Sequence, residues 1–419
     1  MCRSPPPAAV QAVLRQALPS ATVERVQGTP SLRLQRTYDV SLSDGRTVQL
    51  LLSPHPALRL LRFERSLLES EAIFLAWIHS TTIPPTTTPT TTPPKKDSPE
   101  PPPPKPLPQT LPTLLHTTHG LLSPDLASPA TFLLPPPSPT KPTPLSLLTP
   151  PPPPPLRRHL ATQTGALLRR LASLKSPTGR FGPVAAVVPS DLPPERRGYL
   201  GVGGMVGGGG AETWATAFHS LLEGILRDGE DMGVGLPYAA VRRQFRRLGW
   251  CLEGVGGARL AVLEGGEGGN VLVEGGEVVG LADWSGCLFG DPLVATVFSA
   301  AGEGEEGVVE GFNGGEEGGW DAAVVDDVRG AGTRVLLYRM YHALVSVVRE
   351  FYRPRVDSSK RELEARKRLT GVLGRLGEVA DDPKRSHRRP SGELSPAKRI
   401  KGEGEDKQTH DAEEGESKN

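Results

Sequence analysis

The chain has 419 residues, a formal net charge of +1, and only 37% hydrophobic and 5% aromatic residues. A charge so close to zero gives no general attraction to nucleic acid or acidic membranes, so neither is expected as a partner. Three scattered cysteines exclude a disulfide framework or zinc site, and no apolar run is long enough to cross a membrane. We therefore expect a cytoplasmic protein.

The low apolar content is concentrated in two regions of the chain. Of the 45 prolines, 27 lie in residues 81–155, and 32 of the 48 glycines lie in residues 201–320. The remaining sequence has ordinary globular composition and is long enough for a substantial core.

Residues 1–78 are predicted to form the first part of a small β-rich lobe. Residues 31–52 alternate apolar and polar side chains on both sides of Asp44-Gly45, a pattern typical of a β-hairpin. Residues 62–78 repeat apolar side chains at helical spacing.

Proline-rich segments follow this helix. Residues 79–111 have almost no large apolar side chains, which predicts a disordered insertion. Residues 112–148 regain leucine and phenylalanine and are expected to complete the small lobe and form a hinge. Residues 149–156 contain a proline run, interpreted either as a polyproline spacer or as a ligand for an SH3 or WW module.

Residues 157–380 are predicted to form a mostly helical large lobe. The apolar periodicity gives helices near residues 157–174, 211–229, 237–255, 333–352 and 359–378. The acidic, glycine-rich stretch 302–319 is expected to be a flexible loop. Residues 381–419 form a predicted disordered tail with two basic clusters that resemble a bipartite nuclear-import signal.

The segment 259–292 carries the strongest functional pattern in the chain. Asn270 opens an apolar run, a glycine turn follows, and a second apolar run ends at Asp283. In a two-stranded hairpin these two residues lie side by side, where their oxygens suit Mg²⁺ carried by a nucleotide phosphate.

The same segment resembles the aminoglycoside phosphotransferase and choline kinase family, whose fold is related to that of protein kinases. Members carry H-G-D-x-x-x-x-N, two strands, an I-D-W and a following G-D-P. Here Asn270 matches the metal-binding asparagine, Asp283 follows thirteen residues later, and Asp291 lies eight residues beyond that. The resemblance implies an α+β, protein-kinase-like fold with a small β-rich lobe and a mostly helical large lobe.

The resemblance also implies ATP and Mg²⁺ as cofactors. It assigns Asn270 and Asp283 to metal and nucleotide binding, gives Asp291 a structural role, and places Glu71 on the helix that carries the family's phosphate-site glutamate. An ordinary exposed helix residue is the alternative for Glu71.

Two functional positions of the family differ in this chain. Gly265 stands where the family has its catalytic aspartate, and Leu263 stands where it has histidine. Glu264 and Glu267 are the candidate replacement bases, and a mobile loop with solvated charges is the alternative.

The family's phosphate-bridging lysine falls near Leu51, which carries no charge. Arg46 and Arg62 are candidate substitutes for that lysine.

Two other patterns are set aside as chance matches. Gly302, Gly304 and Gly307 form a G-x-G-x-x-G without a preceding strand, which excludes a dinucleotide fingerprint. His116 and His119 have no further ligands at metal spacing.

Two functional hypotheses stay open. The first is ATP-dependent phosphorylation of a small hydroxylated molecule of unknown identity. The second is a catalytically degenerate pseudoenzyme that binds nucleotide or protein partners as a scaffold.

Overall fold

The computed structural model describes residues 4–81, 111–118, 130–138, 140–190, 209–298, 304–314 and 319–381. Nearly all of the predicted insertion 79–111 and of the predicted tail 381–419 therefore lies outside the described residues, as does His119. Contacts group the chain up to Ala380 into one unit.

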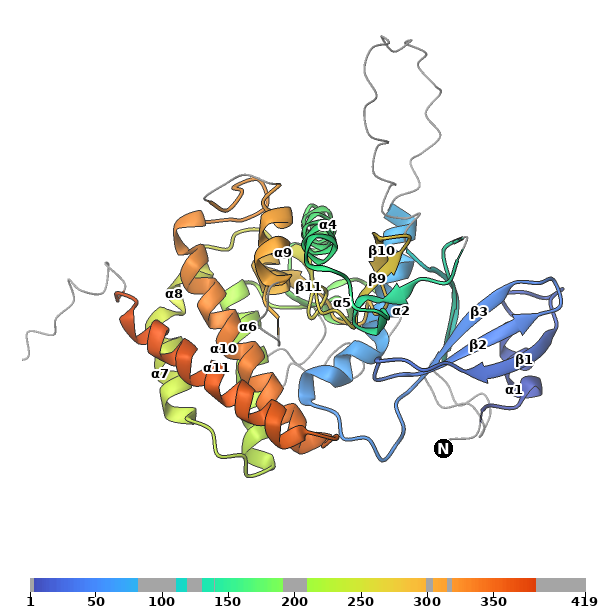
Figure 1. The fold of residues 1–419 in the computed structure, drawn as a ribbon, viewed down its shortest axis with the longest axis horizontal. Helices are drawn as coiled ribbons and strands as arrows, with labels where there is room; N and C mark the ends of the chain where they lie inside the picture. The colour runs from blue at the N-terminus through green and yellow to red at the C-terminus, as the bar shows by residue number, and fades with distance from the viewer. Residues whose placement is uncertain are drawn as a thin grey trace, which may run out of the picture. The chain divides into compact units, whose positions relative to one another are not determined.

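A five-stranded antiparallel sheet forms the small lobe (Figure 1). Its spatial order is β1-β2-β3-β5-β4. The strands are β1 Val23–Gly28, β2 Arg36–Leu42, β3 Thr47–Leu52, β4 Thr113–Thr118 and β5 Ala130–Leu134. Helix α1, Pro7–Leu14, buries Val10, Val13 and Leu14 against a cluster that includes sheet residues such as Val40 and Leu50.

The predicted hairpin at residues 31–52 is confirmed only from Arg36 onward. β2 and β3 pair around Asp44-Gly45, and Gly45 takes the positive φ of +80° that the tight turn requires. Residues 29–35 form a loop rather than strand, so the predicted strand residues Leu32 and Leu34 lie outside the ladder. Neither α1 nor β1 was predicted from the sequence.

Helix α2, Arg62–Thr81, contains the predicted helix at residues 62–78. Its apolar residues Phe74 and Ile78 share a core with Leu51 of β3 and Leu133 of β5. This core also contains large-lobe residues, so α2 connects the sheet to the helices that follow.

The segment after β5 leads into the large lobe. The two-residue strand β6, Thr143–Pro144, pairs with β9, Val271–Glu274, and a short 3₁₀ turn, η1 Leu145–Leu147, follows it. Helix α4 then runs from Pro154 to Ala172.

The predicted spacer at residues 149–156 is too long, because α4 begins at Pro154. Proline is tolerated in the first helical turn, where its missing N–H has no intrahelical partner to lose. Of the predicted spacer, only Thr149–Pro153 lie outside the helix, and the ligand for an SH3 or WW module stays a prediction.

The predicted flexible loop at residues 302–319 contains a helix, α9 Gly304–Phe312. Its glycines pack tightly against α4: a Cβ at Gly311 would overlap the Thr162 carbonyl, and one at Gly307 would lie 2.8 Å from Ala161. Periodicity alone misses this helix because glycine has low helix propensity and the contact is tertiary.

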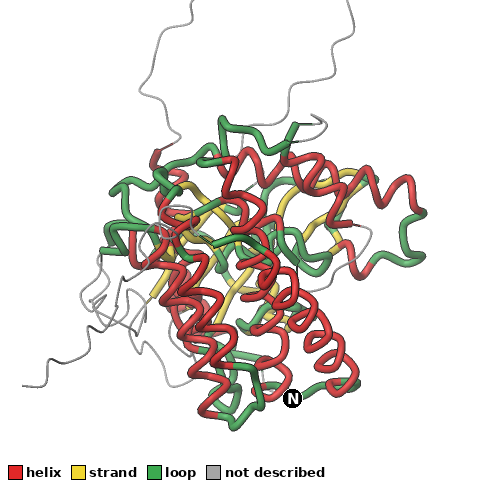
Figure 2. Tube along the Cα trace, turned by 90° about the vertical axis from the view of Figure 1, so that its left-hand side faces the viewer, coloured by secondary structure: helices red, strands yellow, loops and turns green. Residues whose placement is uncertain are grey.

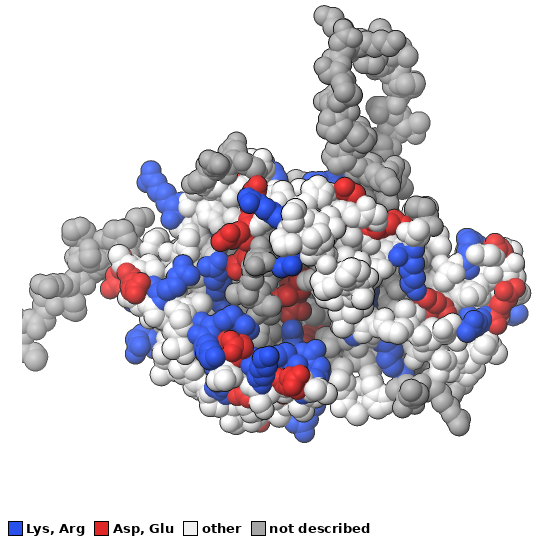
Figure 3. Space-filling view, in the orientation of Figure 1, with Lys and Arg blue, Asp and Glu red and all other residues white. Residues whose placement is uncertain are grey.

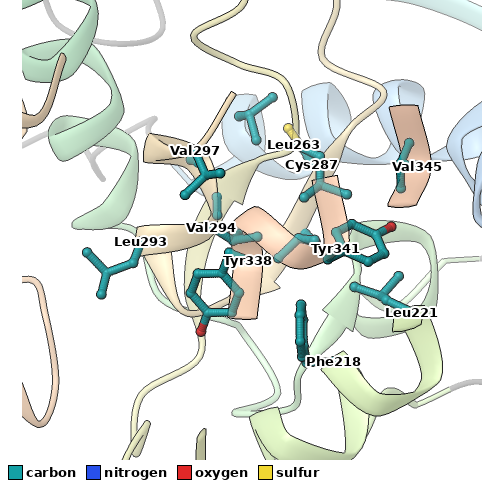
Figure 4. Packing of buried hydrophobic residues seen from close by; sticks show 14 of the residues in the cluster. Phe218, Leu221, Leu263, Cys287, Leu293, Val294, Val297, Tyr338, Tyr341 and Val345 are labelled. Atoms are coloured by element: carbon teal, nitrogen blue, oxygen red, sulfur yellow. The ribbon is translucent and has the colours of Figure 1, made fainter. Parts of the chain in front are cut away.

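The remaining helices of the large lobe follow the predicted pattern except the short helix α5, Val184–Val187, which was not predicted, and Figure 2 shows several of them side by side. They are α5 Val184–Val187, α6 Trp214–Asp231, α7 Tyr238–Leu248, α8 Trp250–Glu253, α10 Val328–Tyr352 and α11 Ser358–Glu378. Figure 4 shows Tyr338 and Tyr341 of α10 packed near Phe218 and Leu221 of α6. Within the described part of the chain, no helix has the length and apolarity to cross a membrane.

Two small sheets complete the large lobe. One has the order β7-β11-β8, from β7 Gly182–Pro183, β8 Arg259–Val262 and β11 Cys287–Gly290. The other places β9 between β6 and β10, Glu277–Leu281. After β11, Asp291 caps the 3₁₀ turn η3, Pro292–Thr296.

Asp291 has the structural role that was expected for it. Its buried carboxylate accepts hydrogen bonds from the Leu293 backbone (3.1 Å), from Arg334 of α10 (2.6 Å) and from the Tyr338 hydroxyl (2.7 Å). These bonds hold the loop that follows β11 against helix α10.

Candidate functional site

The hairpin of β9 and β10 brings the two predicted metal residues together. Gly275 and Gly276 have φ values of +60° and +84°, which a tight two-residue turn needs at both central positions. The ladder pairs Val271 with Leu281, so the residues just outside it meet at the open end of the hairpin.

Asn270 and Asp283 are directly bonded there. The Asn270 side-chain Oδ1 accepts from the Asp283 backbone N–H (2.7 Å), and its Nδ2 donates to the Asp283 backbone oxygen (3.1 Å). The Asp283 carboxylate accepts from the Ser285 N–H (2.8 Å), and its side chain is 26% exposed. The hairpin therefore holds one carboxylate and one side-chain amide next to each other at its open end.

Glu71 of α2 faces the same point. Its side chain is only 2% exposed, which excludes the alternative of an ordinary surface residue, and it accepts weakly from the Trp284 N–H (3.3 Å). Burial raises the pKa of Glu71 to about 7, although a neighbouring arginine acts in the opposite direction.

That arginine is Arg33, which was not predicted from the sequence. Its Nη1 lies 2.6 Å from a Glu71 carboxylate oxygen and 3.8 Å from Asp283 Oδ1, and its side chain is 6% exposed. Arg33 belongs to the 29–35 loop between β1 and β2. Arg33 stands between Leu32 and Leu34, and this alternation of apolar and polar residues predicted a strand with Arg33 on its solvent-facing side.

The two predicted substitute cations are wrong. Arg46 pairs with Asp44 in the exposed β2–β3 turn at 2.6 Å. Arg62 pairs with Asp228 and Asp231 of α6. Leu51, at the family's lysine position, is 4% exposed and belongs to the apolar core.

The loop that replaces the family's H-G-D has its carboxylate in an unexpected place. Glu264 has a φ of +61°, a conformation that glycine adopts freely and other residues adopt at a cost. Its carboxylate lies 2.5 Å from Arg349 of α10. Burial alone would raise the pKa of Glu264, but Arg349 outweighs that effect and holds the pKa below its ordinary value.

Gly265 and Glu267 complete this loop. Gly265 is buried and offers no side chain at the position of the family's aspartate. Glu267 lines the same cavity as Asn270 and Asp283. Of the two predicted replacement bases, Glu264 is held in an ion pair with Arg349.

A cavity of about 2000 Å³ opens beside the mouth of this hairpin. Its lining includes residues 29–34 of the loop before β2, residues 135–138 and 140–142, the pair Asn270 and Asp283, and α10 residues such as His342 and Arg349. Glu71 contacts Arg33 but is not itself part of this lining. The charged residues that line the cavity include both signs, among them Arg33 and Arg349 with Glu267 and Asp283, and the face seen in Figure 3 also carries both signs. The cavity is therefore a mixed-charge site, and it exceeds the roughly 300–1,000 Å³ of ordinary small-molecule pockets.

The residues present fit a magnesium ion. Among the described residues, no cluster of three or more histidine, cysteine, aspartate or glutamate side chains is found. Mg²⁺ bound with a nucleotide uses only one or two carboxylates and takes its other oxygens from phosphates and water. Asp283, with Asn270 locked beside it, supplies such a donor set.

Solved structures share this architecture. The chain aligns with a crystal structure described as a candidate fructosamine-3-kinase from Thermobifida fusca YX-ER1, with a TM-score of 0.51 and 15% identity over 89% of this chain and 98% of that one. It aligns with aminoglycoside phosphotransferase APH(4)-Ia, crystallised with AMP-PNP and hygromycin B, with a TM-score of 0.50 and 14% identity over 89% and 99% of the two chains. No protein-family model and no curated protein sequence matches the chain.

The fold is thus that of the kinase-like phosphotransferases. At such low identity the likeness defines the fold alone, and the chemistry has to be argued from this chain's own residues.

Proposed function

We propose that the cavity binds ATP with Mg²⁺ and that Asn270 and Asp283 hold the metal. The observation that carries this proposal is the meeting of Asn270 and Asp283 on the lining of a cavity with room for a nucleotide, while the buried Glu71 is linked to Asp283 through Arg33. The ternary complex of the structural neighbour with AMP-PNP gives it further support. Bound there, the metal would offset the negative charge of the phosphates.

We further propose that the chain is a pseudoenzyme, a nucleotide-binding protein that has lost the ability to transfer a phosphoryl group. Transfer needs a residue that orients the attacking hydroxyl, and Gly265 has no side chain to do so. Glu264 cannot replace it while its carboxylate is paired with Arg349. In this proposal the residues that bind Mg-ATP are retained, and the carboxylate that would orient the attacking hydroxyl is missing.

Phosphorylation of a small hydroxylated molecule is the second candidate function. Glu267 favours it, because this carboxylate lines the same cavity as the proposed metal residues. In this alternative Glu267 orients the acceptor hydroxyl.

A thermal-shift titration with Mg-ATP tests nucleotide binding. Because a ligand that binds only the native state raises the melting temperature, the unaltered chain is expected to show a Mg-dependent rise. Asp283→Ala is expected to lose the rise. Asp44→Ala, which removes the same charge from an exposed turn, should keep it. No Mg-dependent rise in the unaltered chain would overturn the proposal.

Hydrolysis of ATP and transfer to a panel of sugars and amino alcohols separate the two candidates. The pseudoenzyme proposal expects neither product in the unaltered chain at saturating Mg-ATP. Transfer that is abolished by Glu267→Gln would establish the enzyme instead.

A further inference from the structure

The 29–35 loop crosses from the small-lobe sheet to the hairpin mouth of the large lobe. The Leu32 side chain reaches the backbone of Gly269, where an added Cβ would lie 2.7 Å from it. Arg33 donates to the Ala282 carbonyl through Nη2 and to Glu71 through Nη1. The loop therefore contacts both residues that directly precede the proposed metal pair, Gly269 before Asn270 and Ala282 before Asp283.

The charges around Asp283 favour the binding of a cation first and of an anion afterwards. When both are ionised, Glu71 and Asp283 carry two negative charges, and Arg33 contributes one positive charge beside them. A divalent cation at Asp283 would change the sum from −1 to +1, which attracts a polyphosphate.

Arg33 also has donors left for a ligand. A guanidinium has five N–H groups in a rigid fork, and the hydrogen bonds of Arg33 to Glu71 and Ala282 use two of them. Arg33 is also one of the residues that line the cavity.

We propose that Arg33 is the phosphate-binding cation of this protein, delivered by the β1–β2 loop and oriented by Glu71 in place of a lysine on β3. Strand β3 has only uncharged residues, Thr47–Leu52, and its Leu51 is committed to the core. This inference rests on the proposed binding of Mg-ATP.

Calorimetric titration of the full chain with Mg-ATP, Mg-ADP and adenosine tests this role. Removing Arg33 alone leaves Glu71 buried without its partner, so the informative variant is Arg33→Met with Glu71→Gln, compared with Glu71→Gln alone. The double variant is expected to bind Mg-ATP roughly ten-fold or more weakly than the single variant, the effect of losing charge-assisted hydrogen bonds. The loss should shrink for Mg-ADP and vanish for adenosine, because adenosine carries no phosphate.

Two further variants sharpen the test. Arg33→Lys keeps the charge but not the fork, and is expected to lie between the unaltered chain and the double variant. Arg46→Met removes the same charge from an exposed turn of the same sheet and should bind as the unaltered chain does.

Three results would overturn the inference. If the double variant binds Mg-ATP as tightly as Glu71→Gln, Arg33 does not contact phosphate, while the proposed function stands. If the double variant binds more tightly, Arg33 blocks the cavity instead of serving it. If the unaltered chain binds no Mg-ATP, the proposed function fails and this inference fails with it.

Discussion

Glu71 and Arg33 form an ion pair of 2.6 Å between a helix and a loop, and neither side chain is more than 6% exposed. A buried charge without a partner costs far more than a surface ion pair contributes. The pair therefore constrains the 29–35 loop as well as the charge of the cavity.

Glu71→Ala is expected to destabilise the protein by about 3–5 kcal/mol, because it leaves the Arg33 guanidinium buried and uncompensated. Arg33→Met with Glu71→Gln removes both charges and should recover most of that loss. Urea unfolding followed by circular dichroism measures both changes. Equal destabilisation by the single and double variants would contradict the account of a buried pair.

Asn270→Ala is expected to cost about 1–3 kcal/mol of stability, because it removes two hydrogen bonds that close the hairpin mouth. The same variant should weaken Mg-ATP binding, since Asp283 loses the bonds that hold its backbone. Urea unfolding and the thermal-shift titration measure the two effects. Unchanged stability would show that the amide does not hold the hairpin.

Gly311→Ala is expected to destabilise the protein by about 2 kcal/mol or more, because its Cβ would overlap the Thr162 carbonyl at the α4–α9 contact. Gly224→Ala on α6 is the matched control. No atom lies within 4 Å of its added Cβ, so it should stabilise by about 0.5–1 kcal/mol through helix propensity alone. Urea midpoints that shift in the same direction for both variants would contradict the packing described for α9.

The stability of the protein should depend on the ionisation of His342. Burial lowers the pKa of His342 to about 4, while Glu264 opposes that change, Arg349 reinforces it, and the Val294 backbone opposes it. In the unfolded chain a histidine has a pKa of about 6.5. Between pH 6.5 and 4 the unfolded state therefore binds a proton at His342 that the folded state does not bind. The stability that His342 contributes as a neutral side chain is complete above pH 6.5 and is lost as the pH falls toward 4.

His342→Leu is expected to remove that part of the pH dependence, a difference of roughly 2–3 kcal/mol between pH 6.5 and 4. Urea unfolding of the two chains at matched pH values measures it. Parallel curves for the two chains would show that His342 titrates normally.

Restoring the family's order of glycine and aspartate tests the assignment of the missing base. Glu264→Gly places glycine at the φ of +61°, and Gly265→Asp returns a carboxylate to the next position. Its Cβ would lie 3.0 Å from the Val262 carbonyl and 3.1 Å from a Leu168 methyl, so the neighbours must shift by a few tenths of an ångström.

The double variant is expected to hydrolyse ATP about 10²-fold or more above the background rate of the unaltered chain, which is the range that a positioned base contributes. A phosphate-release assay measures the rate, with Gly265→Asn as the control that restores bulk without charge. Equal rates in the two variants would show that the carboxylate at this position is not what the chain lacks.

Local patterns predicted the hairpins and most helices. Asp44-Gly45 and Gly275-Gly276 define turns through their own backbone freedom, and the mouth of the second hairpin follows from strand pairing over only thirteen residues. The juxtaposition of Asn270 and Asp283 could therefore be predicted from their spacing.

Contacts between distant segments were not predictable in the same way. Arg33 and Glu71 are 38 residues apart, and nothing in the loop sequence shows that its arginine turns inward. The glycines of α9 suggest a loop until α4 is placed against them. From the sequence, Glu71 could be either a phosphate-site glutamate or an exposed helix residue. The packing of α2 shows that it is buried.

Isothermal titration calorimetry with ATP, in the presence and in the absence of Mg²⁺, tests the central claim most directly. The account predicts saturable binding that requires Mg²⁺ in the unaltered chain, is lost in Asp283→Ala and is kept in Asp44→Ala. Binding that is indifferent to Mg²⁺ and to Asp283, or the absence of any binding, would contradict it.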